Sequence, residues 1–252
     1  MTFPVLIPFG PWRLHPHTVF EVLAYTVGFQ IYRGLRRREG DVINNPTRWS
    51  IVVAAAVGGA IGSRVLGALE QPSLLVAHWR DPLVVFGGKT IVGGLIGGLI
   101  AVEWTKRRIG VTTRTGDLFA LPLAVGIAVG RIGCFLTGLD DGTFGTPTAL
   151  WSGIDFGDGI RRHPTQLYEI GFLLLLACIL AAAPPRLNRA GDRFRLFMAG
   201  YFAFRVGIDA VKPDPPLTFG LSAIQVACVA MLLYYSPDLR RWMTPRVEIG
   251  AV

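Results

Sequence analysis

The segment from Asp117 to Gly138 reads DLFALPLAVGIAVGRIGCFLTG and contains one cation, Arg131, near its end. Its length matches the roughly 20 apolar residues that an α-helix needs to cross a hydrocarbon core of about 30 Å. A charge inside such a segment is costly, so we interpret Arg131 as a functional residue that has a partner. The segment therefore predicts a membrane protein whose site includes this arginine.

The composition of the whole chain agrees with this prediction. Of the 252 residues, 51% are hydrophobic and 17% are charged, and the mean hydropathy is +0.46. The net charge of +8 comes mostly from short basic clusters between apolar runs, which indicate topology rather than nucleic-acid binding. Glycines inside the runs, such as Gly58, Gly62, Gly93 and Gly97, would let helices approach closely.

Seven apolar runs predict an all-α integral membrane protein with a single polytopic domain over residues 1–252. The predicted helices cover about residues 18–33, 49–70, 83–104, 117–138, 165–183, 194–211 and 219–235. Sixteen of the 25 lysines and arginines, Arg48 among them, follow the first, third, fifth and seventh runs, and five lie on the other side. The positive-inside rule then places the N-terminus outside and the C-terminus in the cytoplasm. Residues 139–164 become an extracytoplasmic loop, long enough to form an ordered lid or binding loop.

This topology places seven intramembrane charges in the outer half of the bilayer. They are Glu21, Arg64, Lys89, Arg131, Glu169, Arg205 and Asp209. Their common depth predicts a shared polar cavity that opens to the outer leaflet. Four cations there imply an anion such as a phospholipid phosphate, which a planar guanidinium can bind through two parallel hydrogen bonds. The alternative is that the arginines pair with the carboxylates only to hold the helices together.

The most polar stretch that adjoins an apolar run is Arg161–Glu169, RRHPTQLYE. Pro164 suits the first turn of a helix, and Gln166 and Glu169, three residues apart, would face one side of it. Taken alone, the stretch is typical of a helix start with an interfacial tyrosine. The three cysteines, by contrast, fall inside apolar segments without metal-ligand spacing, so neither a disulfide framework nor a metal site is expected.

Several segments, taken in order, resemble the bacterial prolipoprotein diacylglyceryl transferases. Residues Arg162–Glu169 resemble the most recognisable motif of that family, and residues 130–138 resemble its arginine segment. Residues 87–97 resemble its glycine-rich third helix, and residues 201–209 match its late pattern of a tyrosine, an arginine and an acid at four-residue intervals. The resemblance runs from about Gly10 to the seventh apolar run.

The resemblance implies transfer of the diacylglyceryl group of phosphatidylglycerol to the lipobox cysteine of a prolipoprotein, with release of glycerol phosphate and without a cofactor. It implies a bacterial cytoplasmic (inner) membrane enzyme whose partners are phosphatidylglycerol, prolipoproteins and membrane lipids, and not nucleic acid. The expected catalytic residues are Arg131, Arg205, His163, Glu169 and Lys89. The expected substrate-binding residues are Arg162, Gln166, Tyr168, Tyr201, Asp209, Gly93, Gly94, Gly133 and Arg64.

The chain departs from the family pattern at residues that bear on the chemistry of the acceptor thiol. Val92 stands where the family has a histidine before the Gly-Gly-Leu of its third helix. Cys134 and Thr137 replace family asparagines, and Leu139 replaces an acid, with Asp140 and Asp141 adjacent. Lys89, His163 or Glu169 would then be candidates for the base. Two alternatives remain: the same lipid donor with a non-lipoprotein acceptor, or a lipid-binding or transport protein without catalysis.

Overall fold

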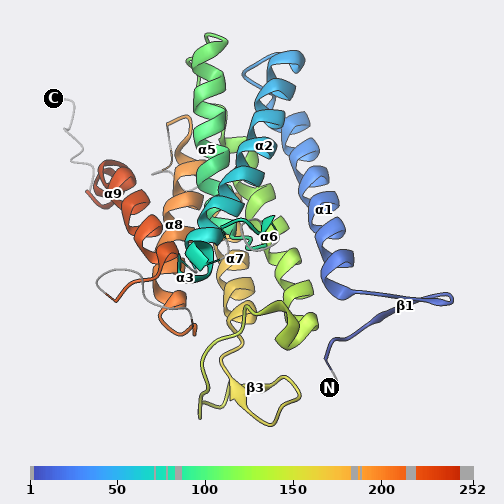
Figure 1. The fold of residues 1–252 in the computed structure, drawn as a ribbon. Helices are drawn as coiled ribbons and strands as arrows, with labels where there is room; N and C mark the ends of the chain where they lie inside the picture. Colours follow the sequence, from blue (N-terminus) through green and yellow to red (C-terminus); the bar gives the residue numbers. More distant parts are fainter. Residues whose placement is uncertain are drawn as a thin grey trace.

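A computed structural model of the chain describes residues 3–70, 72–77, 79–82, 87–182, 187, 189–213 and 220–244. Within them the protein is mainly helical, which confirms the predicted all-α class, and two short antiparallel hairpins accompany the helices (Figure 1). The elements are β1 (Ile7–Phe9), β2 (Trp12–Leu14), α1 (Pro16–Glu39), α2 (Asn45–Leu69), α3 (Pro72–Ala77), α5 (Ile91–Arg108), α6 (Asp117–Thr137), η1 (Gly138–Asp141), β3 (Ile154–Asp155), β4 (Arg161–Arg162), α7 (Thr165–Ala182), α8 (Asp192–Asp209) and α9 (Ala223–Met243).

Seven helices of at least 18 residues in the described part of the chain overlap the seven predicted runs. The third prediction begins too early: residues 83–86 lie outside the described residues, and residues 87–90 are not helical. Helix α5 begins only at Ile91, because the side chain of Thr90 caps it by accepting a hydrogen bond from the backbone N–H of Gly93. Helix α9 likewise begins after Ser222, whereas residue 219 lies outside the described residues.

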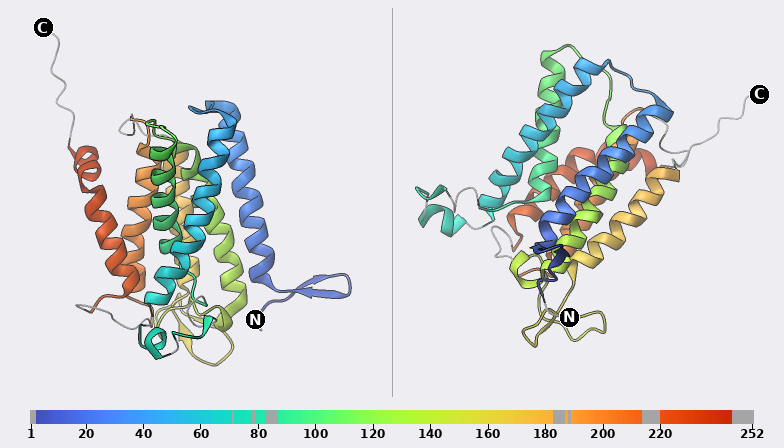
Figure 2. Two further views of the ribbon diagram at one scale, coloured as in Figure 1. Left: turned by 45° about the horizontal axis from the view of Figure 1, so that its top comes forward. Right: turned by 90° about the vertical axis from the view of Figure 1, so that its right-hand side faces the viewer.

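The long helices lie side by side as a bundle (Figure 2). Among the described residues, three segments are long and apolar enough to cross a membrane by length and composition: Asn45–Leu69, Asp117–Asp141 and Thr165–Ala182. The β1–β2 hairpin before α1 and the loop between α6 and α7 both project from one end of this bundle (Figures 1 and 2). That loop is the segment predicted as 139–164, and it contains η1 and the β3–β4 hairpin, in which Ile154 pairs with Arg162.

Arg48, predicted as a loop cation, is instead a buried residue in the first turn of α2. Its guanidinium forms an ion pair with Asp41 and donates a hydrogen bond to the backbone oxygen of Thr115 at 3.1 Å. Burial by itself would raise the pKa of Asp41, but the hydrogen bonds from Arg48 hold it below its ordinary value. This contact ties the start of α2 to the segment that leads into α6.

Helices α2 and α5 pack against each other through glycines. A Cβ atom built on Gly62 would lie 2.3 Å from the backbone oxygen of Gly93, and one on Gly97 would lie 2.3 Å from that of Gly58. The interface therefore has no room for a side chain at these positions, which confirms the predicted close approach. Gly94 differs, because a Cβ there would meet the nearest backbone oxygen at an ordinary 3.6 Å.

Replacement of Gly62 by alanine is expected to destabilise the bundle by about 1–3 kcal/mol, because the added methyl group forces α2 away from α5. The matched control is Gly171→Ala in α7, where an added Cβ meets nothing within 4 Å. Thermal unfolding of both variants in detergent micelles measures the difference. Equal unfolding temperatures for the two variants would contradict the backbone contact between α2 and α5.

Candidate functional site

One carboxylate joins three helices in the interior of the bundle. The Oε2 atom of Glu169, on α7, lies 2.9 Å from Nε of Arg131, on α6, and 3.5 Å from Nη1 of Arg205, on α8. The hydroxyl group of Tyr201, also on α8, donates a hydrogen bond of 2.6 Å to Oε1 of Glu169. All four side chains are buried, so these contacts replace the water that the charges lose.

A second carboxylate extends the group along α8. Nη2 of Arg205 lies 2.7 Å from Oδ1 of Asp209, one turn later, and Nζ of Lys212 lies 3.5 Å from the same oxygen. Of the two residues expected to bind substrate on α8, Asp209 contacts Arg205 directly, whereas Tyr201 contacts Glu169. We call these residues the α6–α8 charge cluster: Arg131, Glu169, Tyr201, Arg205, Asp209 and Lys212. Three cations and two carboxylates leave the cluster with one excess positive charge when all five are ionised.

Buried polar atoms of this cluster and of α7 have no hydrogen-bond partner among the described residues. Gln166 is only 1% exposed, and neither its amide nitrogen nor its amide oxygen has a partner there; the same holds for Nε of Arg205. A buried polar group left without a partner costs about 1–3 kcal/mol. Such groups are typical of a site that binds a polar ligand. Gln166 and Glu169 are both buried, as expected for residues that share one side of α7.

The other predicted intramembrane charges lie outside the α6–α8 charge cluster. Lys89 is exposed in the segment before α5. Arg64, on α2, is partly exposed and donates to the backbone oxygen of Gly87 at 3.3 Å. Glu21 is partly exposed on α1 and accepts a hydrogen bond of 3.4 Å from the hydroxyl group of Tyr25. The prediction of one cavity shared by all seven charges is therefore wrong, because Glu21 lies on α1, Arg64 on α2 and Lys89 in the segment before α5.

At the end of the loop, Arg162 pairs with Asp158, and His163 and Tyr168 contact each other. Nη1 of Arg162 lies 2.7 Å from Oδ1 of Asp158, and this ion pair holds the pKa of Asp158 below its ordinary value. Nδ1 of His163 lies 3.3 Å from the hydroxyl group of Tyr168, which in turn lies 2.8 Å from Oγ of Ser152. These contacts tie the loop to the first turn of α7.

Two of the three glycines predicted to bind substrate lie at tight helix contacts instead. A Cβ atom on Gly133 would lie 2.7 Å from Cβ of Phe20, so this glycine lets α6 approach α1. Gly93 serves the contact between α5 and α2 described above. Gly94 lies beside the same interface at ordinary spacing.

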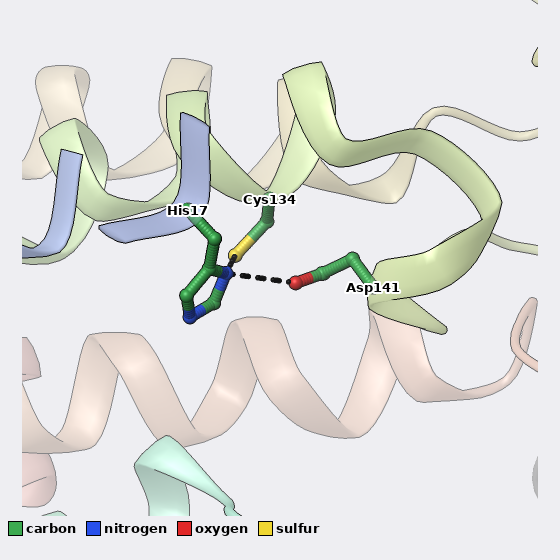
Figure 3. Close-up of side chains that lie close together, drawn as sticks. All are labelled: His17, Cys134 and Asp141. Atoms are coloured by element: carbon green, nitrogen blue, oxygen red, sulfur yellow. Dashed lines mark hydrogen bonds and ion pairs between the residues drawn. The ribbon is translucent and has the colours of Figure 1, made fainter. Parts of the chain in front are cut away.

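A further group joins α1 to the end of α6 and was not singled out by the sequence. Nδ1 of His17 lies 3.1 Å from Oδ1 of Asp141 and 3.9 Å from Sγ of Cys134, and the three side chains point toward one another (Figure 3). Nη1 of Arg131 lies 3.8 Å from the same sulfur, so this group adjoins the α6–α8 charge cluster. No local pattern could have revealed it, because His17 meets the other two only through the packing of α1 on α6.

The fold and the site define a class: an all-helical membrane protein with a charged site buried between its helices. The family described as prolipoprotein diacylglyceryl transferase matches residues 4–236 of the chain. The phosphatidylglycerol–prolipoprotein diacylglyceryl transferase of Methylococcus capsulatus is 31% identical over 92% of each chain, and that of Bordetella parapertussis is 31% identical over 91% of each. The chain therefore belongs to the prolipoprotein diacylglyceryl transferase family and is a transferase, which confirms the resemblance seen in its motifs.

Replacement of Glu169 by alanine is expected to destabilise the protein by about 3–5 kcal/mol, because Arg131 and Arg205 would be left buried without their shared anion. The control is Glu39→Ala: Glu39 also pairs with an arginine, Arg193, at 2.8 Å, but its side chain is 40% exposed. Loss of that surface pair should cost at most about 1 kcal/mol. Chemical or thermal unfolding in detergent measures both changes. Similar losses for the two variants would contradict the central position of Glu169.

Proposed function

We propose that the protein transfers the diacylglyceryl group of phosphatidylglycerol to the lipobox cysteine thiol of prolipoproteins and releases glycerol phosphate. The observation that carries this proposal is the pair of buried arginines, Arg131 and Arg205, which share one carboxylate and lie on helices next to the one that bears the amide of Gln166, unpartnered among the described residues. Membership of the family, and the substrates in the names of its curated members, support the same reaction.

The proposal includes a topology. All seven long helices cross the bacterial cytoplasmic (inner) membrane as one domain over residues 1–252, with the N-terminus outside and the C-terminus in the cytoplasm. The basic residues of the connections support this orientation. The charge cluster then lies in the outer half of the bilayer, near the end of the bundle that carries the loop between α6 and α7. Phosphatidylglycerol of the outer leaflet reaches the site at that depth.

In this reaction the two arginines act on the phosphate of the lipid. Arg131 and Arg205 face the same carboxylate and present further N–H groups, so a phosphate that enters between them gains donors from both sides. When the bond between carbon and phosphate oxygen breaks, the leaving phosphate gains negative charge, which these fixed donors stabilise. The amide of Gln166 supplies a further donor to a lipid oxygen. Glu169 positions both arginines, since its carboxylate is already occupied by three donors.

A second candidate keeps the same donor lipid but transfers its diacylglyceryl group to a non-lipoprotein acceptor. The observation that favours it is Val92, which is fully buried among apolar residues and cannot accept a proton from a thiol. If the protein catalyses neither transfer, the third candidate is a lipid-binding protein without catalytic activity.

Expression in bacteria depleted of their own transferase is expected to restore diacylglyceryl modification of prolipoproteins. Purified protein with labelled phosphatidylglycerol and a lipobox peptide should give labelled peptide together with glycerol phosphate. Release of glycerol phosphate with label in a non-protein product would favour the second candidate. Lipid retention without release of glycerol phosphate would identify a binding protein and overturn both transfer reactions.

Replacement of Arg131 or Arg205 by alanine is expected to lower the transfer rate by about 10²–10³-fold, because each removes donors that stabilise the leaving phosphate. Lysine at either position should recover part of the rate, since it keeps the positive charge but cannot form bidentate hydrogen bonds to a phosphate. Arg13→Ala, in the exposed hairpin at the same end of the bundle, is the control and should leave the rate unchanged. Full activity of both alanine variants would refute the proposed phosphate site.

A further inference from the structure

Three possible metal ligands converge beside Arg131. Nδ1 of His17, Sγ of Cys134 and a carboxylate oxygen of Asp141 all lie within 4.8 Å of one another. Both contacts of the histidine are made by the same ring nitrogen, and Nε2 points away from the sulfur and the carboxylate (Figure 3). A triad of nucleophile, histidine and acid uses the two opposite nitrogens of the ring instead. The three side chains thus have the arrangement of ligands around one ion and not that of a proton relay.

We propose that His17, Cys134 and Asp141 bind a divalent metal ion of the zinc class, and that this ion holds the acceptor thiol in its fourth coordination position. Tetrahedral zinc with ordinary bond lengths separates a nitrogen and an oxygen ligand by about 3.4 Å, and a nitrogen and a sulfur ligand by about 3.6 Å. The corresponding distances here are 3.1 and 3.9 Å. The sulfur and the carboxylate oxygen also lie within 4.8 Å of each other, so an ion between the three ligands would draw them closer together.

Charge and burial suit such an ion. The side chain of Asp141 is 6% exposed and Cys134 is buried, whereas the side chain of His17 is 42% exposed. A thiolate and a carboxylate together balance a charge of two, and the neutral imidazole occupies the side open to the outside. The hydroxyl group of Thr143 donates a hydrogen bond to the other oxygen, Oδ2, of Asp141. That bond leaves Oδ1 directed toward His17. Hydrogen bonds of this kind orient the ligands of metal sites.

The role of the ion rests on the proposed function. Sγ of Cys134 lies 3.8 Å from Nη1 of Arg131, so a thiol on the ion would lie next to the lipid phosphate. On coordination the thiol releases its proton to solvent. The thiolate sulfur then forms a bond to the glyceryl carbon, the bond from that carbon to the phosphate oxygen breaks, and the electron pair leaves with glycerol phosphate. The ion thereby replaces the histidine base that Val92 cannot supply.

The metal site is tested without the reaction. The full-length chain, purified in detergent and equilibrated with Zn²⁺, should contain about one ion per chain by mass spectrometry. Co²⁺ in its place should give the charge-transfer absorption of a cobalt–thiolate bond. His17→Asn and Cys134→Ser should each weaken metal binding by more than about 10-fold, and Thr143→Ala by less than either. His15→Asn and Cys178→Ser are the controls, and unfolding temperatures confirm that all variants fold. Absence of the cobalt–thiolate band in the folded parent protein would overturn the site.

The role of the ion is tested with a lipobox peptide. The peptide with cysteine should shift the Co²⁺ spectrum, and the same peptide with serine should not. Removal of the metal by a chelator should abolish transfer, and Zn²⁺ should restore it. An unchanged spectrum, or equal transfer with and without metal, overturns the acceptor role. A thiol-dependent shift without any transfer supports the site and counts against the proposed function alone.

Discussion

The carboxylate of Glu169 allows two arginines to be buried side by side. Each guanidinium group that leaves water loses several kilocalories per mole of hydration, and two adjacent ones repel each other. The anion between Arg131 and Arg205 offsets both effects, and the hydrogen bond from Tyr201 fixes its position. Because the three helices α6, α7 and α8 each contribute to this contact, the packing of the helices and the burial of the two arginines have the same physical origin.

Much of the α6–α8 charge cluster can be predicted from the sequence, because a charge inside an apolar segment is costly. Arg131 and Arg205 stand out because charges are rare inside apolar runs, and Asp209 follows from its spacing of one helical turn from Arg205. The common side of Gln166 and Glu169 follows from helical geometry in the same way. The contact of one carboxylate with both arginines does not follow, because it depends on how α6, α7 and α8 pack, and no pattern within one helix contains that information.

The incorrect predictions have a common cause. Loop charges and run lengths locate a residue along the membrane normal, but they do not say which neighbour it faces. Lys89 and Arg64 were placed with Arg131 on depth, yet they lie on a different part of the bundle. The basic-cluster count treated Arg48 as solvated, whereas α2 begins early enough to bury it against Asp41. The position of His17 cannot be predicted in this way, because its partners Cys134 and Asp141 lie on other elements, α6 and η1.

The contact between α2 and α5 has a consequence for the proposed reaction, because it restricts where a lipid could enter the bundle. Between Gly62 and Gly93, and between Gly58 and Gly97, backbone meets backbone with less space than one methyl group requires. An acyl chain therefore has no room to pass between these two helices where the glycines meet. In the reaction proposed above, the lipid would therefore reach Arg131 and Arg205 through another seam of the bundle.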